Sequence, residues 1–567
     1  MRAYRLLFAL AFLFTTCKTT QTATSSPSNP LDGIIRQYEQ IGSSSERPSW
    51  VNLSDTSLQA QRTEISNLLV AIDKITPDQL SKNDRINLDV LQFSLEDQLY
   101  HLDFQSHLFP LNAEGGFLTG VLYRLQYYRI GDERDYDNYL HLLSTLPDYF
   151  EHRKAQMQRG QSLGKSSPKL VVRNCMSIIE QVLETDTESL FFFDPIKGQE
   201  ARETEVGQLL KDKVLPAYVA FHDFLESDYL PKAPEKVGIS GITDGKDFYE
   251  QRVRYFTTLD MTPKEVFETG QREVKRIRAE MEAIIAEVGF EGSFADFIEF
   301  LRTDEQFYAK TPAELMKEAA WITKRMEGKL PQYFNKLPRM PLTVSPVPAS
   351  IAPTYTAGRY SRGSYGQRKA GQYWVNTFKL ESRPLYALPA LSLHEGVPGH
   401  HTQIMLAAEM DDIPDFRRNT YFSAFGEGWA LYTEFLGKEA EMYETPYEDF
   451  GRLVYEMWRA CRLVVDPGMH YFDWTRREAF DFMASNTALS LHEVNTEIDR
   501  YIGWPGQAVS YKIGELKIKE LRRRAEQELA SNFNIRSFHD FVLSNGAVPL
   551  RTLERLFEEW LDREKSA

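Results

Sequence analysis

Residues 393–401 read Leu-His-Glu-Gly-Val-Pro-Gly-His-His, a short stretch with three histidines and one glutamate. Catalytic zinc sites use three protein ligands, and histidine nitrogens and carboxylate oxygens are common among them. In the usual metal-binding helix the two histidines are four residues apart, near one helical turn, so both face the same side. Here His394 and His400 are six residues apart, with Pro398 between them. A regular helix would place the two imidazoles on different faces.

The residues between the two histidines predict a local distortion. Pro398 cannot donate a hydrogen bond to the carbonyl of His394, and Gly396 and Gly399 permit unusual backbone angles. Bulges of this kind occur in helices at functional sites. We therefore expect one helix over about 386–410 with a two-residue bulge that returns both imidazoles to one face.

The second histidine ligand is expected to be His400. Within a helix, His401 would point about 100° away, the rotation per residue. His401 would then bond a neighbouring group and support the ligands. The sequence leaves one alternative open: the helix breaks at Pro398-Gly399, and His401 turns toward the ion.

The third ligand is expected from Glu427, within Ser-Ala-Phe-Gly-Glu-Gly-Trp-Ala-Leu-Tyr-Thr at 423–433. Glu427 follows His400 by 27 residues, enough for a helix end, a loop and a returning helix. Its small and apolar neighbours predict burial, and a buried carboxylate is compensated when it binds a metal. His394, His400 and Glu427 are the predicted zinc ligands, and Glu395 is the predicted general base.

Three motifs carry a resemblance to a known family. They read His-Glu-x-x-Pro-Gly-His-His at 394–401, Gly-Glu-Gly-Trp-Ala-Leu-Tyr at 426–432 and Arg-Tyr-x-x-Trp-Pro-Gly-Gln-Ala-x-x-Tyr-Lys at 500–512. In this order they resemble the bacterial family numbered 885 among the domains of unknown function, over most of the chain. More distantly, their order is similar to that of angiotensin-converting enzyme and related zinc carboxypeptidases. The resemblance implies a zinc metallopeptidase.

The same resemblance implies a tyrosine that steadies the oxyanion after the glutamate ligand. By this order the residue is Tyr501, and removing an oxyanion donor costs about 2.7–4 kcal/mol in the transition state. Tyr511 is the competing candidate, four residues after Gln507 and on its helical face. A buried structural tyrosine is the plainer alternative for Tyr501.

A polar stripe interrupts the apolar helix expected over 447–466, which Pro467-Gly468 should end. Arginines in this stripe can bind a substrate carboxylate or support the metal ligands, and a buried ion-pair network is the alternative. The predicted substrate-binding residues are Arg459, Arg462, His470, Gln507 and Lys512.

The expected fold class is mainly α. Apolar residues at intervals of three and four predict helices over most of the chain. Residues 335–388 are rich in proline and glycine, and 371–377 read as a strand whose edge could pair with a peptide. We expect a multi-helix, zinc-peptidase-like fold with a deep cleft and a small β-sheet beside the metal-site helix. An N-terminal helical subdomain at 31–240 would precede the zinc-binding catalytic subdomain at 241–567.

The first residues predict export. Residues 1–17 have a basic start and an uncharged apolar run, as in a signal peptide, and Cys17 suits a lipoprotein processing site. Residues 18–30 are polar and rich in Ser, Thr and Pro, which predicts a disordered tether. The expected location is the periplasm, or the outer membrane as a lipoprotein, of a bacterium.

The charge balance limits the classes of molecule that the protein is expected to bind. Lys and Arg total 66 and Asp and Glu total 81, a net charge of -15, which argues against nucleic acid. The expected partner is a peptide or small amide substrate, with membrane contact only through a lipid anchor at Cys17. The predicted function is zinc-dependent peptide hydrolysis, of carboxypeptidase or oligopeptidase type. The alternatives are a zinc amidase acting on a non-peptide amide and an inactive peptide-binding lipoprotein.

Overall fold

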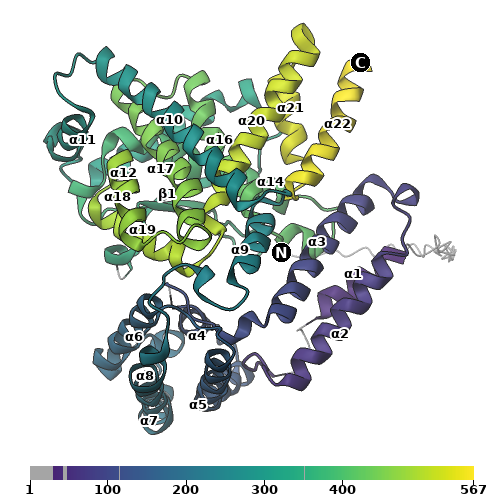
Figure 1. The fold of residues 1–567 in the computed structure, drawn as a ribbon, viewed down its shortest axis with the longest axis vertical. Coiled ribbons are helices and arrows are strands. Elements are labelled where there is room, and N and C mark those ends of the chain that lie inside the picture. Colours follow the sequence, from purple (N-terminus) through teal and green to yellow (C-terminus); the bar gives the residue numbers. More distant parts are fainter. Residues whose placement is uncertain (1–29, 42–46, 114, 350, 567) are drawn as a thin grey trace, which may run out of the picture.

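The computed structural model describes residues 30–41, 47–113, 115–349 and 351–566. The predicted signal segment with Cys17, and the tether up to residue 29, lie outside the described residues. Over the described part the fold is mainly α-helical with one small sheet, as the sequence predicted (Figure 1). None of the described helices combines the length and apolar character needed to cross a membrane.

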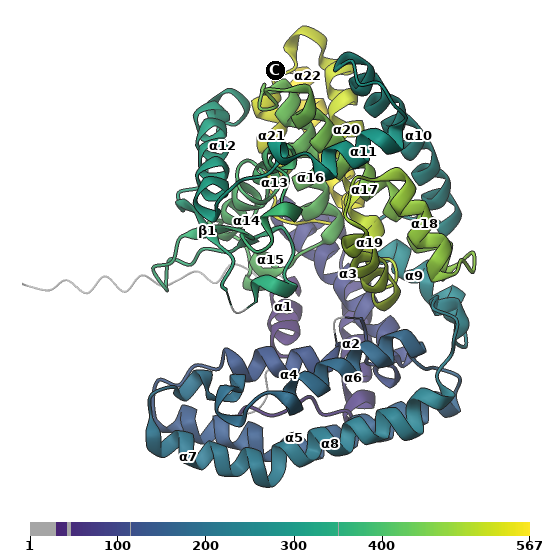
Figure 2. The same ribbon diagram turned by 90° about the vertical axis from the view of Figure 1, so that its left-hand side faces the viewer.

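The first eight α-helices form two groups. Helices α1 to α3 stand together, and α4 to α8 form a layer across the lower end of the molecule (Figure 2). A π-helical turn at Leu210–Val214 joins α7 to α8. The bounds are α1 Pro30–Gln40, α2 Asp55–Ile72, α3 Lys82–Phe104, α4 Phe117–Gln126, α5 Glu133–Ser162, α6 Lys169–Glu184, α7 Glu200–Leu209 and α8 Leu215–Phe224.

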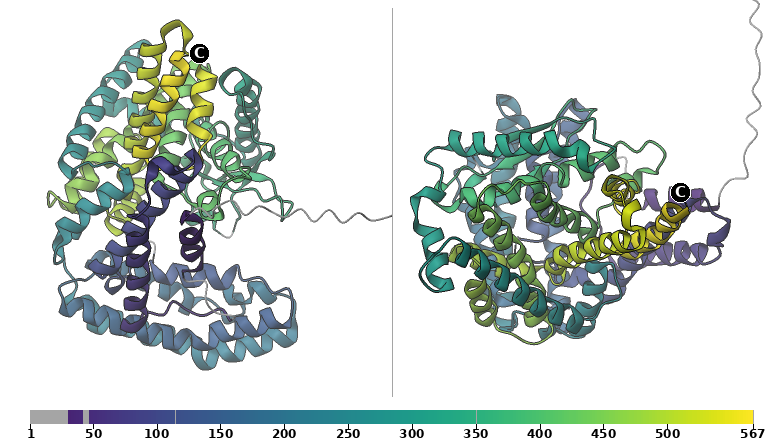
Figure 3. Two further views of the ribbon diagram at one scale, coloured as in Figure 1. Left: turned by 90° about the vertical axis from the view of Figure 1, so that its right-hand side faces the viewer. Right: turned by 90° about the horizontal axis from the view of Figure 1, so that it is seen from above.

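The remaining helices build the larger upper part. Helix α9 lies inside 226–262, a stretch that contains several prolines and glycines. The last helices, α20 to α22, stand together at the C-terminal end (Figure 3). The bounds are α9 Gly245–Thr257, α10 Pro263–Glu287, α11 Phe294–Thr303, α12 Pro312–Tyr333, α13 Leu388–Glu395, α14 His400–Ala408, α15 Asp415–Asn419, α16 Ser423–Glu439, α17 Pro446–His470, α18 Arg476–Asn486, α19 Leu491–Gly503, α20 Ser510–Leu529, α21 Ile535–Leu543 and α22 Leu550–Ser566.

Helix α17 is the central element, buried over most of its length and in contact with α10, α13, α18 and α20. It continues through Pro467 to His470, so the end predicted at Pro467-Gly468 is wrong by one turn. A proline normally breaks a helix interior. Here it falls in the last turn, and His470 is held on both ring nitrogens: Nδ1 accepts from the Ile239 amide at 3.0 Å, and Nε2 lies 3.0 Å from the Tyr501 carbonyl oxygen.

The sheet has three strands in the order β1-β3-β2, with bounds β1 Leu342–Pro346, β2 Gly358–Ser361 and β3 Gly371–Val375. Strand β3 pairs in parallel with β1 and antiparallel with β2. The strand expected at 371–377 therefore exists, but as the central strand. Its two sides are already paired, so the edge proposed for peptide binding cannot be β3. Strand β2 has the free edge on that side.

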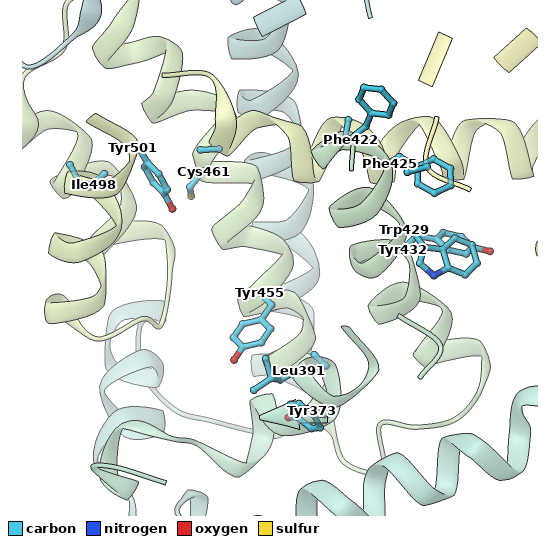
Figure 4. Packing of buried hydrophobic residues seen from close by; sticks show 14 of the residues in the cluster. Tyr373, Leu391, Phe422, Phe425, Trp429, Tyr432, Tyr455, Cys461, Ile498 and Tyr501 are labelled. Carbon is cyan, nitrogen blue, oxygen red and sulfur yellow. The ribbon is translucent and has the colours of Figure 1, made fainter. Parts of the chain in front are cut away.

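A continuous hydrophobic core runs through both halves of the described chain, from Leu31 to Leu561. Figure 4 shows part of it, with residues such as Trp429 and Tyr432 labelled. Helix α3 packs directly on the C-terminal half: the rings of Phe93 and Phe422 meet edge-on at 5.4 Å.

Candidate metal centre

Between His394 and His400 the chain is not one helix: a short loop separates two helices. Helix α13 ends at Glu395 and α14 begins at His400. The Gly396 amide donates to the Ser392 carbonyl and the Gly399 amide to the Leu393 carbonyl, each at 3.0 Å, so two carbonyls near the end of α13 are paired with amides of the loop. A Cβ on Gly399 would lie 2.0 Å from the His394 carbonyl oxygen. The expected single bulged helix over 386–410 is therefore wrong.

The break nevertheless brings the three predicted ligands together. The Nε2 atoms of His394 and His400 lie 3.4 and 3.3 Å from the same oxygen, Glu427 Oε2. The three candidate ligand atoms all lie within 4.8 Å of one another. Glu427 comes from α16, and its other oxygen accepts a hydrogen bond from the Tyr421 hydroxyl at 2.8 Å.

His401 does not turn toward this cluster. Its Nδ1 lies 3.0 Å from the Tyr360 hydroxyl, and its Nε2 lies 3.0 Å from the Met340 carbonyl oxygen. Both ring nitrogens are thus engaged on the far side, next to β1 and β2. The helix breaks where the sequence left a break open, yet His400 faces the cluster rather than His401.

The cluster fits a zinc ion by donor type and spacing. Ligand atoms about 2.0–2.2 Å from a tetrahedral ion lie about 3.3–3.5 Å from one another, and two of the ligand separations here fall at that value. Nδ1 of His394 lies 2.7 Å from Oε1 of the buried Glu434, the carboxylate–histidine contact that orients metal-bound imidazoles. Nδ1 of His400 is buried without a hydrogen-bond partner among the described residues.

The charges of these groups depend on one another. Burial raises the pKa of Glu427, but the two neighbouring histidines outweigh it and hold the pKa well below its usual range. Burial lowers the pKa of His394, whereas its hydrogen bonds to Glu427 and Glu434 raise it, to about 9. The protein alone thus holds an anionic Glu427 beside a protonated His394 imidazole, and a cation can take the place of that proton.

The ligands form part of the wall of a cavity of about 670 Å³. Strand β2 and helices α9, α13, α14, α16, α17 and α19 surround it. Glu395 belongs to this wall, and its Oε2 accepts a hydrogen bond from the Tyr360 amide at 2.7 Å. The predicted base thus lies on the same cavity as the predicted ligands, anchored by β2.

Some of the predicted substrate-binding residues line this cavity. Arg459, Arg462 and Gln507 do so. Both arginines are buried, 5% and 3% exposed, yet Arg459 Nε and Arg462 Nη1 have no hydrogen-bond partner among the described residues. Arg459 also approaches Glu434 at 3.7 Å, which connects it to the His394 ligand.

Lys512 and His470 lie elsewhere. Lys512 is fully buried among three carboxylates, Glu456 at 2.6 Å, Glu515 at 2.5 Å and Glu273 at 3.3 Å. His470 is held between two backbone groups at the end of α17. Neither residue lines the cavity, so the substrate-binding role predicted for them has no geometric support. Lys512 lies instead in a buried network of ion pairs.

The two candidate tyrosines are also placed differently. Tyr511 is part of the cavity wall, and the Arg462 guanidinium lies over its ring at 4.5 Å. Tyr501 is fully buried behind that wall (Figure 4). Its hydroxyl accepts hydrogen bonds from Trp458 Nε1 at 2.9 Å and Arg462 Nε at 2.8 Å.

Two residues of the site were not anticipated. Tyr421 donates to the ligand Glu427, and Arg359 on β2 lines the cavity. Neither stands at a helical or motif spacing from a predicted ligand. For Tyr421 the only available signal was its position six residues before Glu427, where the chain enters α16.

Fold and site together define a mainly helical protein with a buried cluster of two histidines and a glutamate on a large cavity. The chain belongs to the family described as "Bacterial protein of unknown function (DUF885)", whose model matches residues 37–557.

Two solved structures are similar over nearly the whole chain. A "putative lipoprotein" from Colwellia psychrerythraea is 27% identical, with a TM-score of 0.84 over 90% of this chain and 92% of that one. A "putative lipoprotein of unknown function" from Shewanella oneidensis is 14% identical, with a TM-score of 0.71 over 93% of this chain and 97% of that one; at this identity the likeness concerns the fold alone. No curated protein matches the chain.

Proposed function

We propose that this protein is a zinc metallopeptidase, with His394, His400 and Glu427 as ligands. The observation that carries the proposal is that two imidazoles converge on one carboxylate oxygen at 3.4 and 3.3 Å, at the wall of a cavity that also holds Glu395. A zinc ion bound there would supply Lewis acidity, polarising a substrate carbonyl and lowering the pKa of water.

The protein's own residues then supply proton transfer. Glu395 follows the ligand His394 directly and is held by the Tyr360 amide through one carboxylate oxygen only. Its other oxygen is available to take a proton from the attacking water and to pass it to the leaving amine. Tyr511 is better placed than Tyr501 to donate to the oxyanion, because Tyr511 lines the cavity while Tyr501 is fully buried and does not.

Substrate is held by the sheet edge and the arginines. Strand β2 borders the cavity with Gly358, Arg359 and Tyr360. The Tyr360 amide already donates to Glu395, and the rest of this strand edge could bind an extended peptide through main-chain hydrogen bonds. The charged residues on the cavity wall are four arginines, Arg359, Arg459, Arg462 and Arg500, and three glutamates, Glu395, Glu427 and Glu497. With a divalent cation added, the cavity favours a substrate with an anionic group, which Arg459 and Arg462 would bind alongside Gln507.

The experiment is a measurement of metal and turnover on the same samples. We expect about one zinc per chain, as for a single three-ligand site, and chelation should abolish cleavage of a peptide library. Glu395→Gln should keep the zinc and lose nearly all turnover, because it removes a base but no ligand. No transition metal after zinc-supplemented expression, or loss of zinc in Glu395→Gln, would contradict the proposal.

Two other functions are compatible with some of the same observations. A zinc amidase acting on a non-peptide amide would use the same residues, and it is distinguished by turnover of small amides but not of peptides. An inactive peptide-binding lipoprotein would bind the library without cleaving it. The intact Glu395 on the cavity wall favours an enzyme.

The proposed location is outside the cytoplasm, with Cys17 as the lipid attachment site. The apolar run before Cys17 supports this. So does the description of both similar structures as putative lipoproteins. Mass spectrometry of the membrane fraction, comparing the wild type with Cys17→Ser, tests the anchor.

A further inference from the structure

A second cavity, of about 340 Å³, adjoins the metal cavity. Ala357, Leu391 and Tyr455 belong to the walls of both. Leu391 precedes the ligand His394 by three residues on α13, less than one helical turn. Figure 4 labels Leu391 and Tyr455, which project from α13 and α17. The two cavities are therefore adjacent, with these side chains between them.

The walls of the second cavity are mainly apolar. Leu388 and Leu391 come from α13, Val454 from α17, Leu489 from the loop before α19, and Tyr386 from the turn before α13. A cavity of about 150 Å³ is enough for benzene, so this one accepts the largest natural side chains. Charged residues also line it, namely Glu299, Arg302, Glu381, Arg383 and Glu493. A cavity with mainly apolar walls and some polar groups is typical of a site for an apolar part of a ligand.

One end of the cavity is polar but incompletely paired. Arg383 has a buried Nε without a hydrogen-bond partner among the described residues, and its Nη1 is 4.0 Å from Glu493 Oε1. Glu493 already accepts hydrogen bonds from the amide and hydroxyl of Ser490, as the cap of α19. The Arg383 guanidinium can thus donate to one more oxygen, such as that of a phenol hydroxyl, without breaking a close ion pair.

We propose that the second cavity is a side-chain subsite of the metal cavity, and that it takes a bulky apolar side chain of the substrate, an aromatic one best. This inference rests on the proposed peptidase function. Burying a side chain such as Phe contributes about 1.5–3 kcal/mol, which is about 10- to 200-fold in binding or in kcat/KM. Tyrosine fits as well as phenylalanine, because Arg383 can satisfy its hydroxyl.

The experiment uses zinc-loaded protein and peptides that differ at one residue, with Ala, Leu, Phe, Tyr, Glu or Lys at that position. The wild type should prefer Phe and Tyr over Ala by about 10- to 200-fold in kcat/KM. Ala488→Phe fills the cavity from its loop wall, and it should lower this preference at least tenfold. Arg383→Met should lower the preference for Tyr relative to Phe and leave Phe relative to Ala intact.

Two controls separate a subsite from a folding defect. Ala547→Phe alters an equally buried loop alanine, 6% exposed against 7%, on the wall of neither cavity, and should leave the preference unchanged. Melting temperature and zinc content are measured for every variant. Equal loss for all peptides in folded, zinc-loaded Ala488→Phe would overturn the subsite, because the cavity would then act as a passage. An unchanged preference would overturn it too.

A binding measurement makes the inference independent of turnover. Zinc-loaded Glu395→Gln is titrated calorimetrically with the same uncleaved peptides, with and without Ala488→Phe. Tighter binding of Phe than of Ala, lost in the double variant, supports the subsite even where the wild type cleaves nothing and the proposed function fails. Equal binding of Phe and Ala overturns the subsite even where the wild type is an active peptidase.

Discussion

His400 and His401 are adjacent in the chain but face opposite sides of the site. We expect His400→Ala to lose most of the bound zinc, because one of three ligands is removed. His401→Ala should retain it, since both ring nitrogens of His401 contact Met340 and Tyr360 instead. Zinc per chain, measured by elemental analysis of the two purified variants, checks this. Zinc loss in His401→Ala with retention in His400→Ala would contradict the assignment.

The candidate ligands could be predicted because a buried histidine or glutamate needs a compensating partner, and a metal ion is one of few that suit both. Two histidines, an adjacent glutamate and a later glutamate in an apolar setting define a metal-type donor set. Lys512 and His470 could not be placed in the same way. A polar residue on a buried helix needs a partner, but its sequence position does not say whether that partner is a substrate or, as for Lys512, three carboxylates from α10, α17 and α20.

Helices α10, α17 and α20 meet at Lys512, so replacing this residue tests how much its ion pairs stabilise the packing of the three helices. We expect Lys512→Met to lower the free energy of unfolding by about 3–5 kcal/mol, because it leaves buried carboxylates without their cation. Lys324→Met removes an exposed ion pair and should change the free energy of unfolding far less than Lys512→Met does. Denaturant unfolding measures both. A normal unfolding curve for Lys512→Met with only a raised KM would instead indicate substrate binding.

Asp466, buried on α17, predicts a pH effect on stability. Its Oδ1 accepts hydrogen bonds from Tyr249 and from the Gly506 amide, and Oδ2 has no partner among the described residues. Burial raises its pKa to about 7, against these hydrogen bonds. The unfolded chain ionises near pH 3.9, so the charged form destabilises the fold above pH 7. As the pH falls from 7 toward 4, Asp466 binds a proton in the folded protein, and the free energy of unfolding rises.

Asp466→Asn lacks this titration. The difference in unfolding free energy, variant minus wild type, should therefore be more favourable at pH 8 than at pH 5, by about 2–3 kcal/mol, or two pKa units. Thermal melts at the two pH values measure it. The same difference at both values would show that Asp466 does not change its charge in this range.

Some helices and strands could be predicted from the sequence and others could not, and the reasons are physical. Long amphipathic helices such as α10 and α12 follow from apolar spacing and from threonines that cap their first turns. The break between α13 and α14 was only the alternative to the expected bulge, because glycine and proline permit a bulge and a break equally. The central position of β3 was missed because pairing partners depend on chain segments that alternation within one strand does not identify.

At the scale of the molecule, the boundary expected at residue 240 does not separate two packing units. Helix α3 belongs to the N-terminal half, yet Asp89 pairs with Arg555 at 2.7 Å and Asn87 accepts from Arg417 at 2.9 Å. Helices α1 to α3 thus complete the core of the C-terminal half, while α4 to α8 lie below as a layer (Figure 2).

We therefore expect residues 241–567 expressed alone to lack a cooperative melting transition, because the faces that α3 covers would be exposed. Residues 31–567 serve as the control, and coexpression with 31–240 should restore the transition. Circular dichroism melts and zinc content measure the outcome. Cooperative melting and normal zinc content in 241–567 alone would show that the C-terminal half folds independently.

The loop between α13 and α14 also affects how such sites are found by sequence. A pattern search that requires two histidines one helical turn apart passes over residues 394–400, although the side chains converge in space. Here the spacing is set by the loop, with Gly399 where no side chain fits. A search phrased as His-Glu, two variable positions, Pro-Gly and His, followed about 27 residues later by Gly-Glu-Gly-Trp, would recover chains that share this geometry.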